Sequence, residues 1–315
     1  KILFTPDFAR AKKGEEGFWV VSTGQLGTFR CDSGRHACTW PSMSMYGMKT
    51  PRRTFVAIVK SLKYYFHVEV TAQDGAVDEI GCGYQVADLA AEWGCEVIVH
   101  YSFPRHMSYE TIVAKHDAMQ LTAEGYGIEF VERDCPDPTG DAGMSGAQAA
   151  ILEDVPKVME EYAGKKVCFY CTNCGMQVAL QQAILEQENA YCALPCCPSP
   201  FHGFQEAFGL ESSYGDIEGT IKILANYLDE NNATGRFSTW AVPVNMAMIL
   251  GGYEYATAWA KGELTEKVDL ELLADCFSAA AGATAEFGTY TDGTTNYDNY
   301  LLVAFNPINF ADYVG

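Results

Sequence analysis

The sequence has little positive charge: 21 lysines and arginines stand against 41 aspartates and glutamates, for a formal net charge of −20 at pH 7. Nucleic-acid binding needs a basic surface that neutralises phosphates, so this balance argues against DNA or RNA as a partner. No apolar stretch approaches the ~20 residues that a membrane-spanning helix needs. Internal repeats and low-complexity tracts are also missing from the sequence. What is present, 48% hydrophobic and 20% charged residues, is typical of a globular protein.

Signatures of nucleotide binding and of nucleophilic catalysis are missing as well. The segment 140–146, Gly-Asp-Ala-Gly-Met-Ser-Gly, precedes a predicted helix but matches neither the phosphate-loop pattern nor the dinucleotide fingerprint. Asp137 and Asp141 would repel a phosphate there. No serine or cysteine lies in a recognisable nucleophile elbow. We therefore expect no cofactor, and ligand contact rather than catalysis.

Twelve cysteines are too few for a disulfide-built scaffold at 315 residues, because a chain of this length buries a large core of its own. The spacing Cys168-x-x-Cys171-x-x-Cys174, with Cys196 and Cys197 following, is compatible with an iron–sulfur or zinc site. Cys168, however, lies inside a strand pattern, where a buried thiol behaves as a small hydrophobe. We expect no bound metal. A disulfide from Cys174 to Cys196 or Cys197 is the stronger alternative, and reduced thiols stay open.

The chain is organised around the stretch 97–110. Its apolar start predicts a strand buried on both faces, and Pro104 ends that strand because proline donates no ladder hydrogen bond. Ser108 is the predicted N-cap of a following helix. The loop between them lies at the carboxyl end of the strand, where open α/β sheets bind ligands.

The same strand–loop–helix theme recurs along the chain. Apolar runs begin near residues 97, 128, 167 and 191, with helices predicted over 79–93, 108–124, 145–162 and 176–187. This alternation predicts a parallel sheet with right-handed crossovers. Later elements are predicted helices at 246–261 and 269–281 and a strand at 299–305. Earlier ones are strands at 1–4, 18–22 and 66–71, a helix at 55–62, and a turn between Cys31 and Cys38.

Five blocks of sequence resemble an uncharacterised bacterial family, the domain of unknown function 3798. They are residues 100–110 (HYSFPRHMSYE), 137–143 (DPTGDAG), 172–174 (TNC), 197–203 (CPSPFHG) and 235–246 (GRFSTWAVPVNM). The match covers about residues 66–305, whereas residues 1–55 match poorly and leave the completeness of the first lobe open. The resemblance implies an exported, extracytoplasmic lipoprotein, its anchor outside this sequence, with the two-lobed α/β fold of type I periplasmic binding proteins. It implies no particular ligand.

We therefore expect two lobes of parallel sheet flanked by helices. The first lobe comprises residues 1–95 plus about 237–275, and the second 96–236 plus about 276–315. The expected function is solute binding: the lobes close on a small polar ligand and deliver it to membrane subunits of an ABC-type transporter. The candidate ligand-binding residues come from predicted loops: Tyr101, Arg105, His106, Asp141, Asn173, His202, Arg236 and Trp240.

Each candidate has a chemical reason. Arg105 and Arg236 would pair with a carboxylate or phosphate by bidentate hydrogen bonds, and Trp240 would stack on a ring or sugar face. One alternative is an enzyme on the same scaffold, with His106 or His202 as acid–base or a redox or metal centre built from the thiols of residues 171, 174, 196 and 197. A surface interaction protein without a ligand is the third possibility.

Overall fold

The computed structural model describes residues 30–31, 38–39, 74–211, 216–264, 269–291 and 296–315. The chain divides into two compact units. Unit 1 comprises Lys1–Gly75, Val244–Ala280 and Thr289–Leu301; unit 2 comprises Ala76–Pro243, Ala281–Gly288 and Leu302–Gly315. The strands predicted at 1–4, 18–22 and 66–71 and the helix at 55–62 lie outside the described residues.

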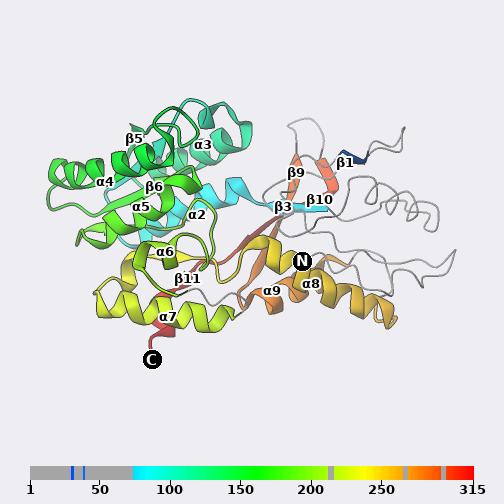
Figure 1. Ribbon diagram of the computed structural model, residues 1–315. Coiled ribbons are helices and arrows are strands. Elements are labelled where there is room, and N and C mark those ends of the chain that lie inside the picture. The colour runs from blue at the N-terminus through cyan, green and yellow to red at the C-terminus, as the bar shows by residue number, and fades with distance from the viewer. Residues whose placement is uncertain (1–29, 32–37, 40–73, 212–215, 265–268, 292–295) are drawn as a thin grey trace. The chain divides into compact units, whose positions relative to one another are not determined.

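A parallel sheet forms the centre of unit 2 (Figure 1). Its strands are β4 (Val97–Ser102), β5 (Glu129–Asp134), β6 (Val167–Cys171) and β7 (Ala190–Tyr191), in the order β5-β4-β6-β7. All neighbouring pairs are parallel, which confirms the predicted sheet. A further parallel bridge joins Cys192 to Phe237, just before β8 (Ser238–Thr239). The chain order across the sheet is therefore 2-1-3-4-5, with its reversal between β4 and β6.

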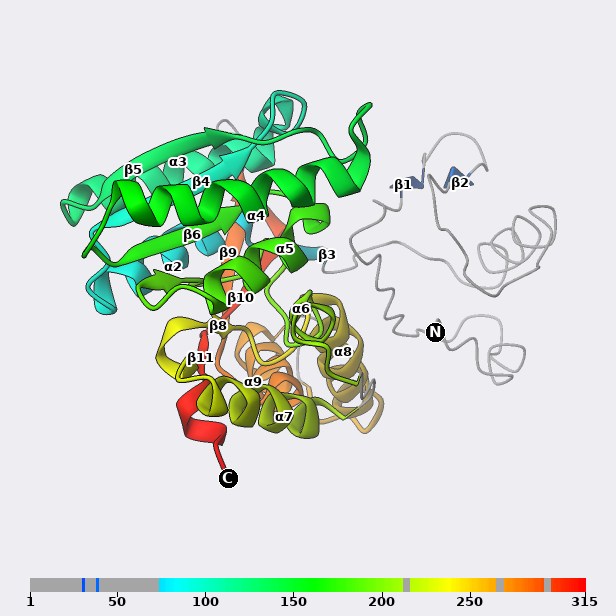
Figure 2. The ribbon, with the colours of Figure 1, turned by 60° about the vertical axis from the view of Figure 1, so that its left-hand side comes forward.

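Four helices cover the sheet in two pairs. Helices α2 (Glu79–Glu92) and α3 (Glu110–Gly125) pack together, as do α4 (Gly143–Glu161) and α5 (Cys174–Leu185). Figure 2 shows α4 and α5 in front of the strands, with α2 and α3 behind them. All residues of β4 are buried, as its unbroken apolar run predicts, whereas the edge strand β5 is partly exposed.

The start of α3 differs from the prediction. Residues 106–108 form a short 3-10 turn, η2 (His106–Ser108), and the N-cap of α3 is Tyr109. Ser108 is not the cap, because its hydroxyl donates a hydrogen bond back to the Arg105 carbonyl at 2.6 Å. The turn matters for the site, because it places Arg105 and His106 beside the strand end.

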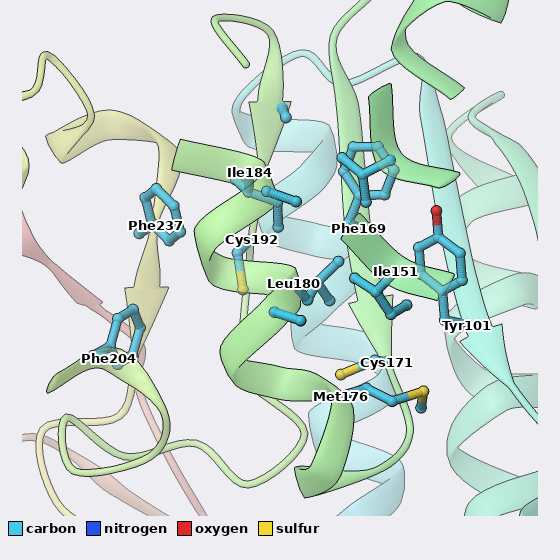
Figure 3. Packing of buried hydrophobic residues seen from close by; sticks show 14 of the residues in the cluster. Tyr101, Ile151, Phe169, Cys171, Met176, Leu180, Ile184, Cys192, Phe204 and Phe237 are labelled. Carbon is cyan, nitrogen blue, oxygen red and sulfur yellow. The ribbon is translucent and has the colours of Figure 1, made fainter. Parts of the chain in front are cut away.

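The core of unit 2 lies between the sheet and α4 and α5. Figure 3 shows Tyr101, Ile151 and Phe169 packed together, with Leu180 and Ile184 of α5 beside them. Full burial of an aliphatic or aromatic side chain contributes roughly 1.5–3 kcal/mol each, so this cluster is a main source of stability.

The remaining elements of unit 2 lie beyond β7. They are α6 (Phe204–Phe208), α7 (Ile217–Glu230), η3 (Thr234–Arg236), β8, β11 (Ile308–Asn309) and η4 (Phe310–Tyr313). β11 pairs antiparallel with β8. The Phe204 ring meets those of Phe237 and Phe310 edge-on, at centroid distances of 6.3 and 5.7 Å. These edge-to-face contacts join the C-terminal segment to the core of unit 2.

In unit 1, α8 (Val244–Ala260) and α9 (Leu270–Ala281) approach closely at Gly251, where a Cβ would lie 2.7 Å from the Phe277 ring. A three-stranded sheet has the order β3 (Asp74–Val77), β10 (Asn296–Phe305), β9 (Ala285–Thr291), and the unit boundaries at 75–76, 301–302 and 288–289 fall within these strands. β1 (Arg30–Cys31) and β2 (Cys38–Thr39) pair antiparallel, with Cys31 opposite Cys38. Within the described ranges, no helix is both long and apolar enough to cross a membrane.

The boundaries of the two units differ from those of the two expected lobes. The segment 79–93, expected in the first lobe, is α2 and belongs to unit 2 because it packs on α3. The chain passes from one unit to the other at 75–76, 243–244, 280–281, 288–289 and 301–302. The lobe assignment itself stays a prediction.

Candidate functional site

The strand order reverses between β4 and β6, so the loops that follow these strands run in opposite directions. Open α/β sheets bind ligands in the crevice that this reversal creates, outside the carboxyl ends of the strands. Ser102 Oγ and Thr172 Oγ1 lie 3.1 Å apart at these ends, both buried. Backbone hydrogen bonds from Thr172 to Tyr101 and from Cys135 to Ser102 align the starts of the loops after β4, β5 and β6.

An ion pair joins the loop after β4 to the loop after β5. Arg105 Nε and Nη2 donate to the two carboxylate oxygens of Asp137 at 2.6 and 2.9 Å, a bidentate contact. Asp137 Oδ1 also accepts from the backbone and hydroxyl of Thr139, and Arg105 Nη1 donates to the Tyr109 hydroxyl. The Arg105 guanidinium and the Thr139 donors hold the pKa of Asp137 well below its usual range. The arginine is therefore oriented while its side chain stays 41% exposed.

His106 and Asn173 connect the loop after β4 to the loop after β6. The His106 ring stacks on Phe103 with centroids 4.9 Å apart, and its Nε2 lies 3.5 Å from Asn173 Nδ2. His106 Nδ1 is buried and has no hydrogen-bond partner among the described residues. Burial and the neighbouring Arg105 lower the pKa of His106, so its ring is neutral at pH 7 and offers one donor and one acceptor.

Asn173 has a structural task as well. Its Oδ1 accepts a hydrogen bond from the Gly175 backbone at 2.9 Å, which makes it the N-cap of α5. A Cβ at Gly175 would lie 3.1 Å from both Asn173 Oδ1 and Pro138. This close approach brings the loop after β5 against the start of α5, so the loops after β4, β5 and β6 all meet near Asn173.

A cluster of three thiols and one imidazole lies where the loops after β6 and β7 meet. Cys174 Sγ lies 3.5 Å from Cys197 Sγ and 3.8 Å from Cys196 Sγ, and Cys196 Sγ lies 3.2 Å from His202 Nε2. A hydrogen bond with Cys196 raises the pKa of Cys174 to about 12. A hydrogen bond with Cys174 raises the pKa of Cys197 to about 12. Burial lowers the pKa of His202 to about 4. None of the ten described cysteines is in a disulfide.

The structure brings four of the eight predicted site residues to these loops with partners from a neighbouring loop or element: Arg105, His106, Asn173 and His202. Asp141 is exposed on the loop after β5. Two residues that the prediction did not include belong to the same group, Tyr109 and Asp137. Asp137 stands at the start of an Asp-Pro-Thr segment, a turn signal that points to a side chain bonding its own backbone.

The other three predicted residues have structural partners in place of a ligand. Tyr101 is buried in the core, and its hydroxyl donates to Asp154 Oδ2 at 2.9 Å. Trp240 has no exposed surface; its Nε1 donates to Gln85 Oε1 at 2.8 Å and its ring meets Phe305 edge-on. The sequence pattern predicts Tyr101 in a loop, but it lies within the buried strand β4. The placement of Trp240 was not predictable from local sequence, because the partner of its indole lies 155 residues away.

Arg236 lies at the amino end of β7, away from the carboxyl edge. Its Nη1 donates to the carbonyls of Ile184, Gln187 and Ala190, and its Nη2 donates to that of Leu185. A cation at the C-terminus of a helix is favoured by the helix dipole and satisfies its last carbonyls. The guanidinium therefore fastens the end of α5.

The 2-1-3-4-5 parallel sheet, flanked by helices and with polar side chains at its switch point, is a doubly wound α/β sheet, as the expected type I periplasmic-binding-protein-like fold requires. The chain belongs to the family described as "Protein of unknown function (DUF3798)", whose model matches residues 67–238. This confirms the resemblance carried by the five sequence blocks.

Known proteins are similar to this chain in sequence or in fold. Two uncharacterized proteins of Treponema pallidum (strain Nichols) are 28% identical over 141 residues and 36% identical over 58 residues, covering 45% and 18% of this chain. The chain spans 62% of the first relative's length and 26% of the second's. A putative transcriptional regulator from Clostridium difficile 630 has a similar fold, with TM-score 0.67 and 20% identity over 79% of this chain and 69% of its own.

Proposed function

We propose that the protein is an extracytoplasmic solute-binding protein that takes a small polar ligand at the carboxyl edge of the unit 2 sheet. The observation that carries this proposal is the meeting of three loops at the switch point. Arg105 is held by Asp137, and His106 lies beside Asn173, so side chains from successive loops converge where this kind of sheet binds ligands. Fold class alone supports solute binding only by analogy, so the proposal rests on these residues.

The charges at this edge limit the ligand. Asp137 stays ionised because Arg105 lowers its pKa, so the pair is close to neutral, and three of the five guanidinium N–H groups already donate to Asp137 and Tyr109. His106 is neutral and Asn173 is an uncharged amide. With a chain net charge of −20, this arrangement favours a neutral or zwitterionic solute with both donors and acceptors over a multiply charged anion.

Two further parts of the proposal follow from the expected class. The two lobes close on the ligand, and the loaded protein delivers it to membrane subunits of an ABC-type transporter. The exported lipoprotein location belongs to the same proposal. Each is tested separately from ligand binding, because a transporter partner can be absent while the site still binds.

The experiment is native mass spectrometry of the gently purified full chain, followed by denaturing release of any small molecule. A melting-temperature screen with sugars, nucleosides and amino acids accompanies it. We expect one small polar molecule per chain or a ligand that raises the melting temperature, since a ligand that binds only the folded state stabilises it. A bare protein whose melting temperature no compound shifts would contradict the proposal.

Variants connect the ligand to the loops. Arg105→Ala and Asn173→Asp are expected to weaken binding at least about tenfold, the loss of one good polar contact of about 1.4 kcal/mol. Aspartate is a good N-cap, so Asn173→Asp keeps α5 capped while it removes the amide donor. Arg133→Ala is the matched control, because Arg133 of β5 pairs with the exposed Glu161 at the end of α4. Equal losses in Arg105→Ala and Arg133→Ala would place the ligand elsewhere.

A further inference from the structure

The thiol cluster at the ends of β6 and β7 has the composition and spacing of a metal site. Cys174 is the first residue of α5, and Cys196, Cys197 and His202 lie on the segment between β7 and α6. Because β6 and β7 are neighbouring parallel strands, the segments that follow them meet at the same edge. Their four donor atoms lie within 4.8 Å of one another.

The separations match a single tetrahedral ion. With Zn–S near 2.3 Å and Zn–N near 2.0–2.1 Å, a tetrahedral centre has S···S edges of about 3.8 Å and S···N edges of about 3.5 Å. The three Sγ···Sγ distances here are 3.5, 3.8 and 4.0 Å, and Cys196 Sγ to His202 Nε2 is 3.2 Å. A disulfide would bring one pair to about 2.05 Å and leave the third thiol apart. A four-iron cluster would push all the thiols farther from one another.

We infer that Cys174, Cys196, Cys197 and His202 form a mononuclear Zn²⁺ site. Three thiolates and one imidazole are one of the ligand sets of closed, structural zinc sites, in which no position is left for water. Each thiol gives up its proton when it binds the ion. The ion fastens the segment after β7 to the start of α5.

Side chains of α5 already hold the ligand loop in place. Gln177 Oε1 accepts hydrogen bonds from the Cys196 backbone at 2.9 Å and from Cys171 Sγ at 3.4 Å. Gln181 Nε2 donates to the His202 carbonyl at 3.3 Å. Such outer contacts orient the ligands of metal sites, so the site is ordered before the ion arrives.

The other thiols of this region do not belong to the site. Cys171 and Cys192 are buried in the core, as Figure 3 shows, and Cys168 is buried in β6. The sequence spacing Cys168-x-x-Cys171-x-x-Cys174 therefore contributes only its last member. The expectation of no metal rested on the placement of Cys168 inside a strand; the ligand set instead joins Cys174 to residues 196–202 of the next loop.

The site bears on the proposed function through one neighbour. Asn173 directly precedes Cys174, so an ion on Cys174 fixes the turn that presents Asn173 to the switch point. The inference does not depend on ligand binding, however. Zinc occupancy is measured on the metal alone, so the zinc site and the solute site can fail independently.

The test is the zinc content of the full chain, purified without chelators and measured by elemental analysis. We expect about one zinc ion per chain, as a closed structural site holds. Cys174→Ser, Cys197→Ser and His202→Gln are each expected to lower the zinc content at least about tenfold. Cys276→Ser, on α9, is the matched control and keeps the full zinc content, because Cys276 lies outside the cluster.

Two further measurements test the zinc site even if the serine variants fold poorly. His202→Cys completes a four-cysteine set and is expected to retain zinc. Co²⁺ added to the metal-free wild-type chain is expected to give the intense visible bands of tetrahedral cobalt with thiolate charge-transfer absorption. Full zinc content in Cys174→Ser would overturn the inference. So would a zinc-free chain in which peptide mapping finds a disulfide between Cys174 and Cys197, or one that carries iron in place of zinc.

Discussion

Lys115 of α3 forms an ion pair with Glu79 in the first turn of α2, and its ammonium group is buried. Lys115 Nζ also lies 5.8 Å from the centroid of the Tyr170 ring and 3.5 Å from the Cys196 carbonyl. Burial alone would lower the pKa of Lys115, but Tyr170 and Glu79 raise it well above its ordinary value. The lysine therefore stays charged and links α2, α3, β6 and the loop after β7.

Removing the partner of this charge is expected to cost stability. Glu79→Gln leaves the Lys115 ammonium buried without its carboxylate, and breaking a buried pair in this way costs about 3–5 kcal/mol. We expect a loss near the lower end, since the Glu79 side chain is 31% exposed. The measurement is urea unfolding of the full chain at pH 7.

An exposed pair of the same kind is the matched control. Glu153 and Lys157 pair one helical turn apart on α4 and are largely exposed. Glu153→Gln is therefore expected to change the free energy of unfolding by no more than about 0.5 kcal/mol. The double variant Glu79→Gln with Lys115→Met should recover part of the loss, because it removes the unpaired charge. Equal losses of unfolding free energy in Glu79→Gln and Glu153→Gln would show that Glu79 and Lys115 do not form a buried ion pair.

The helices and strands of unit 2 could be predicted because the burial of each one is reflected in its local pattern of apolar residues. A strand covered on both faces, such as β4 or β6, has a continuous apolar run, and the helices alternate with these strands at regular spacing. The sheet and the loop positions of Arg105, His106 and Asn173 follow from that pattern. The limits of α3 do not, because Ser108 bonds backward to Arg105 and not forward into the helix.

Trp240 and Arg236 lie apart from the loops of the candidate site because their hydrogen-bond partners come from elsewhere in the chain. Trp240 donates to Gln85 and Arg236 donates to carbonyls at the end of α5, both far away in sequence. An aromatic or a guanidinium in a predicted loop has the composition of a binding residue, but only the tertiary fold decides whether it faces a ligand or a buried partner. The thiols show the converse: Cys174 was predicted to pair with Cys196 or Cys197, and the structure places it beside both, although the three thiols are free and not joined in a disulfide.

Tyr101 offers a direct check of its buried placement. Tyr101→Phe removes the hydroxyl that donates to Asp154 and leaves the ring packed on Phe169. We expect a loss of about 0.5–1.5 kcal/mol, the net value of one hydrogen bond, with ligand affinity unchanged. Urea unfolding and a binding isotherm with whatever ligand the screen identifies measure the two effects. A large change in affinity at unchanged stability would place Tyr101 in the ligand site.

Arg236 is expected to matter for the end of α5. Arg236→Met fills much of the same space but leaves the carbonyls of Ile184, Gln187 and Ala190 without their donor. Loss of charged donors to buried carbonyls is expected to cost about 3 kcal/mol. Amide hydrogen exchange should rise at residues 185–191 more than elsewhere in unit 2. Unchanged exchange there would mean that the guanidinium does not hold the helix end.

His100 makes the stability of unit 2 depend on pH. Its ring is buried in β4, stacked on Tyr170 at 5.8 Å and edge-on to His116 at 4.9 Å. Burial, with smaller effects from the charges of His116 and Lys115, lowers the pKa of His100 to about 3. The unfolded chain takes up a proton near pH 6.5, whereas the folded state stays neutral until about pH 3.

The sign of the effect follows from that difference. The stabilising contribution of neutral His100 is fully present above about pH 6.5 and falls by about 1.4 kcal/mol per pH unit as the pH decreases toward 3. Between pH 6.5 and 4.5, wild type is therefore expected to lose about 2–3 kcal/mol more stability than His100→Phe, which has no proton to bind. Tyr170→Phe is the control, because it alters the same ring stack but keeps His100, so it should retain the wild-type slope. Urea unfolding across this pH range measures the three slopes, and parallel slopes for wild type and His100→Phe would mean that the imidazole already titrates in the folded protein.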